Sequence, residues 1–229
     1  MLVIVSAGIA PGLALLSFFY LKDQYDQEPV LTVFKAFMFG AILTFPIMFI
    51  QYVLSVEEIG TGEIFNSFIS ASLLEEFFKW FILFFVIYQH ADFTEPYDGI
   101  VYGASVSLGF ATVENILYLL GNGLEFAFGR ALLPVSSHAL FGVMMGYYLG
   151  KAKFNVNGRR QYWLCYSFAA PFLLHGIYDL ILHSEETWLY YIVPFMLFLW
   201  WIGMRKVKHA HLLTKKYYDA LSLEEKSTS

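Results

Sequence analysis

The chain has 229 residues, of which 58% are hydrophobic and 14% are charged, whereas an average soluble domain is about 25% charged. This excess of apolar residues argues against a soluble protein. A formal net charge of −5 without a basic cluster argues against a nucleic-acid-binding surface, and a single cysteine, Cys165, excludes an intrachain disulfide.

Seven apolar stretches follow one another along the chain, each close to the 17 to 25 residues needed to cross a bilayer. Lipid offers no hydrogen-bond partners to an open backbone, so each stretch is predicted to be a helix. The first stretch lacks the basic start and the cleavage site of a signal peptide, so we interpret it as a retained helix. The predicted fold is all-α, a polytopic transmembrane helical bundle with spans Leu2 to Leu21, Val33 to Leu54, Ile64 to Tyr88, Ile100 to Leu120, Ala127 to Gly150, Tyr162 to Leu182 and Thr187 to Met204.

Basic residues are distributed unevenly between the loops on the two sides of this predicted bundle. Cytoplasmic loops of membrane proteins are enriched in Lys and Arg. Arg130 is predicted on the outer side and Lys79 within a span. We predict an outside N-terminus and a cytoplasmic C-terminus because one side carries twelve of the 14 basic residues: Lys22, Lys35, Lys151, Lys153, Arg159, Arg160, Arg205, Lys206, Lys208, Lys215, Lys216 and Lys226.

The chain becomes polar after Leu212. Residues 1–212 are predicted to form a single membrane-embedded domain, and residues 213–229 a polar cytoplasmic tail. Such a composition cannot bury enough apolar surface to fold alone, so the tail is expected to be a frayed end.

The predicted third span carries three ionisable residues near its middle, Glu75, Glu76 and Lys79. Each charge costs roughly 2.5 to 3.5 kcal/mol to insert, and the span's fifteen Leu, Ile, Phe and Val residues contribute about 0.3 to 0.6 kcal/mol each. Lys79 lies at helical spacing from both acids, so either can pair with it. A salt bridge accounts for one acid, and a second acid at this depth is typical of a general base.

The fourth and fifth predicted spans also contain polar residues. Glu114 is buried in the fourth span, where an acid serves structure or function equally well. In the fifth span His138 shares a helix face with Gly142, Gly146 and Gly150. Glycine stripes let helix backbones approach closely, so His138 is expected to press against a neighbouring span.

The sixth predicted span contains His175 and Asp179 at i,i+4 spacing. This spacing lets the carboxylate of Asp179 orient the imidazole of His175 and set its tautomer. A single buried histidine is usually a packing residue, but a second one in His138 favours a functional interpretation.

These polar residues are predicted to lie at similar depth in the bilayer. A rise of 1.5 Å per residue puts Glu75, Glu114, His138 and His175 roughly 9 to 16 Å from the outer ends of their spans. We therefore predict one water-containing site that is reached from outside. Two acids and two histidines suit hydrolysis, in which a glutamate deprotonates water while imidazoles stabilise the oxyanion and protonate the leaving amine. The same residue types also suit a zinc ion that activates water.

Motifs of other intramembrane proteases are missing from the sequence. His-Glu-x-x-His and Gly-x-Gly-Asp do not occur. Ser105 and His175 faintly resemble a rhomboid serine dyad, but the two side chains are predicted roughly 12 Å apart in depth. A serine protease is therefore not favoured.

Four motifs in this order resemble the PrsW family, which belongs to the superfamily of CAAX-prenyl and bacteriocin-processing proteases. They are Glu-Glu-x-x-Lys at 75–79, Phe-x-x-x-Glu at 110–114, His-Ala-x-x-Gly at 138–142 and His-x-x-x-Asp at 175–179. The segment Tyr-Leu-Lys-Asp-Gln-Tyr-Asp at 20–26 extends the resemblance over nearly the whole chain. It implies a protease of the bacterial cell membrane that makes the first, outside cut in a membrane-spanning anti-sigma factor and so starts release of the sigma factor.

The resemblance also implies roles for particular residues. Glu75 and Glu76 would supply the catalytic carboxylates and His175 a catalytic imidazole, and Glu114 and His138 would complete the site. Lys79 and Asp179 would orient these groups: they touch the reacting side chains rather than the substrate. The CAAX enzymes usually have histidine where this chain has Glu114, so their metal ligands do not transfer directly.

Three alternatives accompany this interpretation. The preferred mechanism is metal-independent and uses the glutamates, whereas a zinc-dependent version would use Glu114, His138 and His175 as ligands. An ion transporter or proton relay would need polar groups that continue to both faces, and the cytoplasmic halves of the predicted spans carry few. A sensor that binds partner helices through its glycine faces would tolerate replacement of Glu75.

Overall fold

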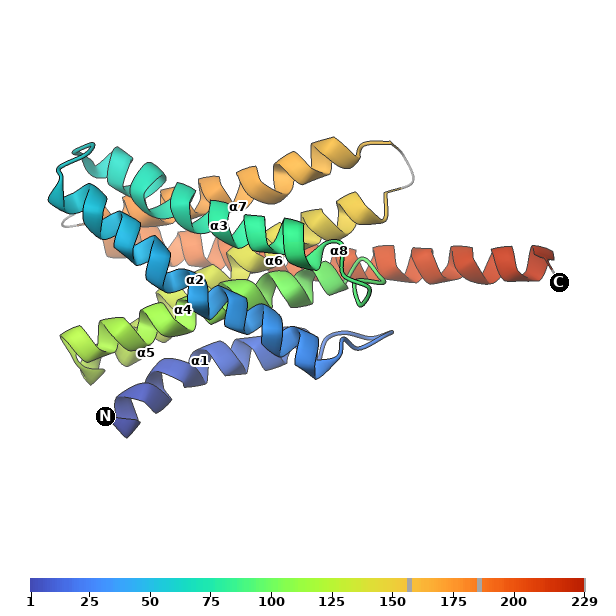
Figure 1. The fold of residues 1–229 in the computed structure, drawn as a ribbon, viewed down its shortest axis with the longest axis horizontal. Coiled ribbons are helices and arrows are strands. Elements are labelled where there is room, and N and C mark those ends of the chain that lie inside the picture. Colours follow the sequence, from blue (N-terminus) through green and yellow to red (C-terminus); the bar gives the residue numbers. More distant parts are fainter. Residues whose placement is uncertain (156–157, 185–186, 229) are drawn as a thin grey trace.

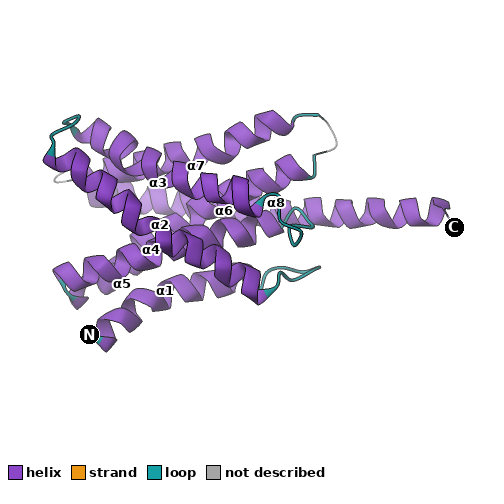
Figure 2. Ribbon diagram, in the orientation of Figure 1, coloured by secondary structure: helices purple, strands orange, loops and turns teal. Residues whose placement is uncertain are grey.

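The computed structural model describes residues 1–155, 158–184 and 187–228, and this part of the chain consists of helices and connecting loops (Figures 1 and 2). The prediction of an all-α polytopic bundle is confirmed. The elements are α1 (Leu2–Tyr20), α2 (Val30–Val56), η1 (Phe65–Leu73), α3 (Leu74–Ile82), η2 (Leu83–Ile87), α4 (Asp98–Asn122), η3 (Leu124–Phe126), α5 (Ala127–Arg130), η4 (Ala131–Val135), α6 (Ser136–Lys153), α7 (Arg160–His183) and α8 (Trp188–Thr228).

Six helical stretches in the described part are long and apolar enough to cross a membrane: Leu2–Tyr20, Val30–Val56, Asp98–Asn122, Leu124–Lys153, Arg160–His183 and Trp188–Glu224. The expected third span is present as η1, α3 and η2 in direct succession. Its three central charges distinguish its composition from that of the other six. In Figure 1 this segment runs antiparallel to α2 and α7, as a seventh crossing would.

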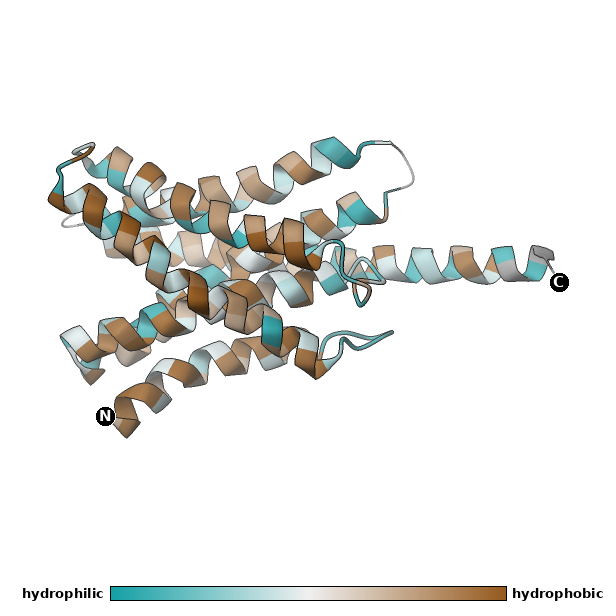
Figure 3. Ribbon diagram, viewed as in Figure 1, coloured by the Kyte–Doolittle hydropathy of each residue, from teal (hydrophilic) through white to brown (hydrophobic). Residues whose placement is uncertain are grey.

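The two central helices of the bundle are α4 and α6. Every residue from 98 to 112 and from 135 to 150 is buried, whereas α1, α2 and α8 expose large apolar side chains such as Phe45, Phe49 and Leu197. In Figure 3 the ribbons of the outer helices α1 and α2 are coloured mostly as hydrophobic. Outward-facing apolar residues suit a lipid environment, since lipid rather than water covers them.

Glycines set the close contact between α4 and α6. A Cβ atom on Gly146 would collide with the carbonyl oxygen of Gly99, and one on Gly142 with that of Gly103. Gly150 likewise faces the backbone of Pro96. This confirms the predicted close approach of the glycine stripe to a neighbouring span. The close contact also places the N-terminal turn of α6 beside the polar residues of α4.

The predicted frayed tail is instead helical, because α8 continues to Thr228. The first part of the tail packs on the loops at that end of the bundle. Thr214 is fully buried and its hydroxyl accepts a hydrogen bond from the backbone N–H of Tyr97 at 3.2 Å. The ring of Tyr217 contacts Phe154, with ring centroids 5.1 Å apart. Tertiary contacts thus stabilise a segment too polar to fold alone; Ser229 lies outside the described residues.

Candidate active site

The paired acids lie where the third crossing changes its helical geometry. Glu75 and Glu76 occupy the first turn of α3, directly after the π-helical segment η1. π-helical turns are frequent at functional sites because they reorient the side chains that follow them. The hydroxyl of Ser72 donates a 2.5 Å hydrogen bond to the carbonyl oxygen of Phe172, which fastens this turn to α7.

Lys79 forms the centre of the charged cluster and is completely buried. Its ammonium nitrogen lies 2.9 Å from Oε1 of Glu76 and 3.3 Å from Oε2 of Glu75. The expectation that a lysine would account for only one acid is therefore wrong, because Lys79 pairs with both. The ammonium also lies 4.2 Å from the ring centroid of Phe110 on α4, a favourable cation–π contact.

His138 connects α6 to the acids of both neighbouring helices. Its Nδ1 atom lies 3.2 Å from the nitrogen of Lys79, and its Nε2 atom lies 3.1 Å from Oε2 of Glu114. An ammonium can only donate, so Nδ1 accepts and Nε2 carries the proton directed at Glu114. The other oxygen of Glu114 accepts a 2.8 Å hydrogen bond from the guanidinium of Arg130.

His175 on α7 lies between two carboxylates, that of Glu76 on α3 and that of Asp179 one turn further along α7. Its Nδ1 atom is 2.9 Å from Oε1 of Glu76, and its Nε2 atom is 3.3 Å from Oδ2 of Asp179 without good hydrogen-bond alignment. The imidazole stacks on the ring of Phe141, with ring centroids 5.0 Å apart. Each ring nitrogen thus faces one acid, in the arrangement that the i,i+4 spacing suggested for Asp179.

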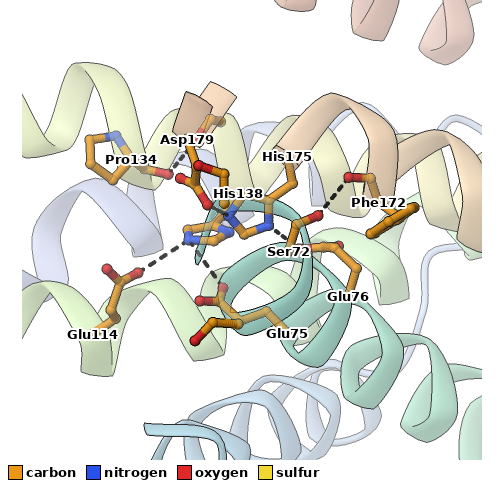
Figure 4. A network of polar contacts seen from close by, with 12 residues as sticks. Ser72, Glu75, Glu76, Glu114, Pro134, His138, Phe172, His175 and Asp179 are labelled. Atoms are coloured by element: carbon orange, nitrogen blue, oxygen red, sulfur yellow. Dashed lines mark hydrogen bonds and ion pairs between the residues drawn. The ribbon is translucent and has the colours of Figure 1, made fainter. Parts of the chain in front are cut away.

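The two imidazoles lie side by side, with ring centroids 5.1 Å apart. Figure 4 shows His138 and His175 between Glu114 on one side and Glu75 and Glu76 on the other. Helices α3, α4, α6 and α7 each contribute to this group, so residues separated by 99 positions, such as Glu76 and His175, meet in one cluster. The geometric part of the prediction, a single polar cluster from four spans, agrees with the structure.

The two adjacent glutamates differ in their surroundings. The side chain of Glu76 is completely buried, whereas that of Glu75 is 10% exposed. The side-chain amide of Gln51 on α2 donates a 3.2 Å hydrogen bond to Oε1 of Glu75 and another of 3.2 Å to the carbonyl oxygen of Ser70. Glu75 is therefore the acid of the pair that water or a substrate reaches first.

The residues that fit a metal ion differ from the expected zinc ligands. Glu75, Glu76, His138 and His175 each offer a ligand atom within 4.8 Å of the others, whereas the sequence suggested Glu114 together with the histidines. Two carboxylates and two imidazoles match the donors that zinc prefers. Glu114 instead pairs with Arg130 and His138.

Two members of the cluster were missed by sequence reasoning. Arg130 was assigned only as an outer-side basic residue, although a lone arginine that follows a span containing Glu114 is a signal for an ion pair. Gln51 gave a weaker signal, since it lies near the C-terminal end of an otherwise apolar span. Ser105 donates to the carbonyl oxygen of Val101 at 2.6 Å, which agrees with the rejection of a serine dyad.

The chain is similar in sequence to a family of known proteins. A sequence profile described as PrsW family intramembrane metalloprotease matches residues 28–202. The chain is 63% identical over 210 residues to a protein named Protease PrsW from Bacillus subtilis, covering 92% of this chain and 96% of that protein. It is 62% identical to Protease PrsW of Geobacillus kaustophilus, covering 90% and 92%, and 35% identical to that of Clostridioides difficile, covering 86% and 87%. No solved structure matches the chain significantly. On this evidence the chain belongs to the PrsW family of intramembrane proteases.

Proposed function

We propose that this membrane protease makes the first, extracytoplasmic cut in a membrane-spanning anti-sigma factor and so starts release of the sigma factor in a bacterial cell membrane. The family likeness supports peptidase activity, and it disfavours the transporter and sensor alternatives. The Lys- and Arg-rich loops and the α8 tail lie at one end of the bundle (Figure 1). This end would be cytoplasmic, so the opposite end, with the N-terminus of α1, would be outside.

The central observation for this proposal is the buried group of Glu75, Glu76, His138 and His175, whose ligand-type atoms lie within 4.8 Å of one another. Charged groups inside a membrane are costly and usually serve function. A hydrolase needs a base for water and an acid for the leaving amine in one place. This group contains both.

Glu75 would act as the general base. Its carboxylate is the more exposed of the pair, and Gln51 holds one of its oxygens. Its Oε2 atom, 3.3 Å from Lys79 and 3.9 Å from Nε2 of His138, would take the proton of the attacking water. Glu76 would hold Lys79 and His175 in place through its Oε1 atom.

His175 would supply the proton for the leaving amine. An imidazolium donates from both nitrogens, and each nitrogen of this ring faces a carboxylate oxygen. Asp179 would hold the ring's orientation from the outer side. His138, whose Nε2 atom lies 3.1 Å from Oε2 of Glu114 and 3.9 Å from Oε2 of Glu75, would stabilise the developing oxyanion when the substrate reaches this nitrogen.

A zinc-dependent version of the same reaction is the second candidate, favoured by the donor set and by the family description. Glu75, Glu76, His138 and His175 would hold the ion, which would polarise the scissile carbonyl and lower the pKa of a bound water. Lys79 competes for this position, since its ammonium contacts three of the four residues. We favour the glutamate mechanism because Lys79 already balances the two acids.

Cleavage by the reconstituted protein tests the proposal. Purified protein in liposomes would be mixed with a candidate anti-sigma factor, and wild type would be compared with Glu75→Gln and His175→Gln, each with and without a zinc chelator. Glu63→Gln is a matched control, because Glu63 is an exposed acid in the loop before η1.

Four outcomes separate the candidates. The glutamate mechanism is supported if Glu75→Gln and His175→Gln lose cleavage while wild type and Glu63→Gln still cleave in the presence of chelator. Loss with chelator that zinc restores supports the metal-dependent version. Full activity of Glu75→Gln contradicts the site assignment. Cleavage of unrelated membrane peptides but not of any anti-sigma factor contradicts the proposed substrate.

A further inference from the structure

A second group of buried acids lies far from the candidate active site. Asp23 belongs to the loop between α1 and α2, Glu95 to the loop before α4, and Asp98 to the first turn of α4. Their exposed fractions are 5%, 0% and 0%. Asp98 and Glu114 share α4, so a rise of 1.5 Å per residue separates the two acid groups by roughly 24 Å along this helix.

Most carboxylate oxygens of this group lack a well-aligned hydrogen bond although they are buried. Both oxygens of Asp23, both oxygens of Glu95 and Oδ1 of Asp98 are buried and accept no well-aligned hydrogen bond from the part of the chain that the structure describes. None of the ion pairs found in that part includes these acids. Ionised carboxylates are almost never buried without a partner, so these oxygens point to a missing ligand.

The backbone presents the free oxygen of Asp98 to the other acids. Its Oδ2 atom accepts hydrogen bonds from the backbone N–H groups of Thr94 at 2.6 Å and Glu95 at 2.8 Å, which leaves Oδ1 for the interior of the group. Glu28 is 3% exposed and accepts a hydrogen bond from the hydroxyl of Tyr102 through Oε2, while its Oε1 atom has no partner among the described residues. The carboxyl group of Glu28 lies close to that of Asp98, so a fourth acid adjoins the first three.

We propose that Asp23, Glu95 and Asp98 bind a divalent cation that prefers oxygen ligands, namely Ca²⁺ or Mg²⁺. One carboxylate oxygen from each residue lies within 4.8 Å of the others. Oxygens bound to one Ca²⁺ at about 2.3 to 2.6 Å are at most about 5 Å apart, so the spacing fits one ion. All ligands are carboxylates, which distinguishes this site from the His-containing group near Lys79 and disfavours zinc.

Binding would join the α1–α2 loop, the loop before α4 and the first turn of α4. Asp23 anchors the α1–α2 loop and Glu95 the loop before α4. Tyr218 of α8 approaches Glu95 and stacks on Tyr25, with ring centroids 5.1 Å apart. The ion would therefore hold both loops and the tail helix together, and this inference is independent of the proposed proteolytic function.

Cation titration of the full-length protein tests the proposal. Protein purified in detergent would be stripped with chelator and titrated with Ca²⁺ and with Mg²⁺ by calorimetry, and with Mn²⁺ by paramagnetic resonance. We expect one ion per chain in wild type and in Glu75→Gln. The Asp23→Asn/Glu95→Gln double variant should bind the ion at least about tenfold more weakly, because it loses two of the ligand charges. Asp26→Asn, which removes an exposed acid from the same loop, should bind as wild type does.

Thermal unfolding provides a second measurement of cation binding when the affinity is too low for calorimetry. Saturating cation should raise the melting temperature of wild type and Asp26→Asn but not of the double variant. Absence of stoichiometric binding by wild type, or equal affinity of wild type and the double variant, would overturn the proposal. Binding that disappears in Glu75→Gln instead would assign the ion to the other acid group and equally overturn it.

Discussion

The ammonium nitrogen of Lys79 lies 3.2 Å from Nδ1 of His138, which is 59 residues further along the chain. Because the ammonium donates to Nδ1, the proton of the neutral imidazole resides on Nε2 and is directed at Glu114. The same nitrogen of Lys79 pairs with Glu75 and Glu76. One buried lysine therefore balances two acids and sets the tautomer of a histidine.

Replacing this lysine should destabilise the protein. Lys79→Met leaves two buried carboxylates without their cation, and we expect the free energy of unfolding to fall by about 3 to 5 kcal/mol. Denaturant titration of the purified protein in detergent measures this. Lys79→Met/Glu76→Gln should recover part of the loss, since only one acid remains charged. Lys35→Met, at an exposed position of α2, should change little; equal effects of the two single variants would contradict the role given to Lys79.

Arg130 should support activity through Glu114 rather than by contacting substrate. Arg130→Gln removes the 2.8 Å hydrogen bond to Glu114, which frees that carboxylate to move away from His138. We expect roughly tenfold slower turnover, equivalent to about 1.4 kcal/mol of transition-state stabilisation, in a protein that remains folded. Cleavage assays on Arg130→Gln and on Arg205→Gln, at an exposed position of α8, measure this. Unchanged turnover in Arg130→Gln would show that the ion pair is dispensable.

The contact between α4 and α6 should not tolerate a side chain. In Gly146→Ala the new Cβ meets the carbonyl oxygen of Gly99, so the helices must separate and the free energy of unfolding should fall by about 1 to 3 kcal/mol. Gly121→Ala provides a matched control in α4, because a Cβ there meets no atom within 4 Å. This control should be neutral or slightly stabilising. A Gly146→Ala protein as stable as wild type would mean that the helices are further apart than in the structure.

The polar tail should divide into a structural part and a dispensable part. Deletion of residues 213–229 removes the buried Thr214 and the ring of Tyr217 from Phe154, so the melting temperature should fall. Deletion of residues 220–229 leaves these contacts intact and should have little effect. Thermal unfolding of both truncations distinguishes this from a domain that ends at Leu212, for which the two deletions would behave alike.

The fold could be predicted from the sequence because the length of an apolar run directly limits which helices cross a bilayer. Most of the polar cluster was equally visible, because an ionisable residue such as Glu75 or His175 stands out within an apolar run. The third crossing shows what composition alone does not predict. The segment is long enough to cross a bilayer, but its three charges give it the composition of a helix in a soluble protein. The pairing of Lys79 with both acids of the same segment, together with contacts to His138 and His175 on other helices, explains how it is accommodated.

Pairings between helices were not visible in the sequence. Arg130 and Glu114 lie on different elements, and no periodicity relates them. The acids Asp23 and Glu95 were overlooked for a different reason, since polar residues are expected in loops and only tertiary structure buries them. Asp98 was overlooked for the same reason, because the sequence placed it in the loop before the fourth span, whereas it lies fully buried in the first turn of α4.

The order in which the chain is synthesised gives the contact between Lys79 and His138 a further consequence. A ribosome adds roughly 5 to 20 residues per second, so His138 follows Lys79 by roughly 3 to 12 seconds. During that interval the third crossing carries its charges without their partners on α6 and α7. We therefore expect this segment to stay beside the insertion machinery, or in a shallow position at the membrane surface, until the later helices arrive and draw it into the bilayer.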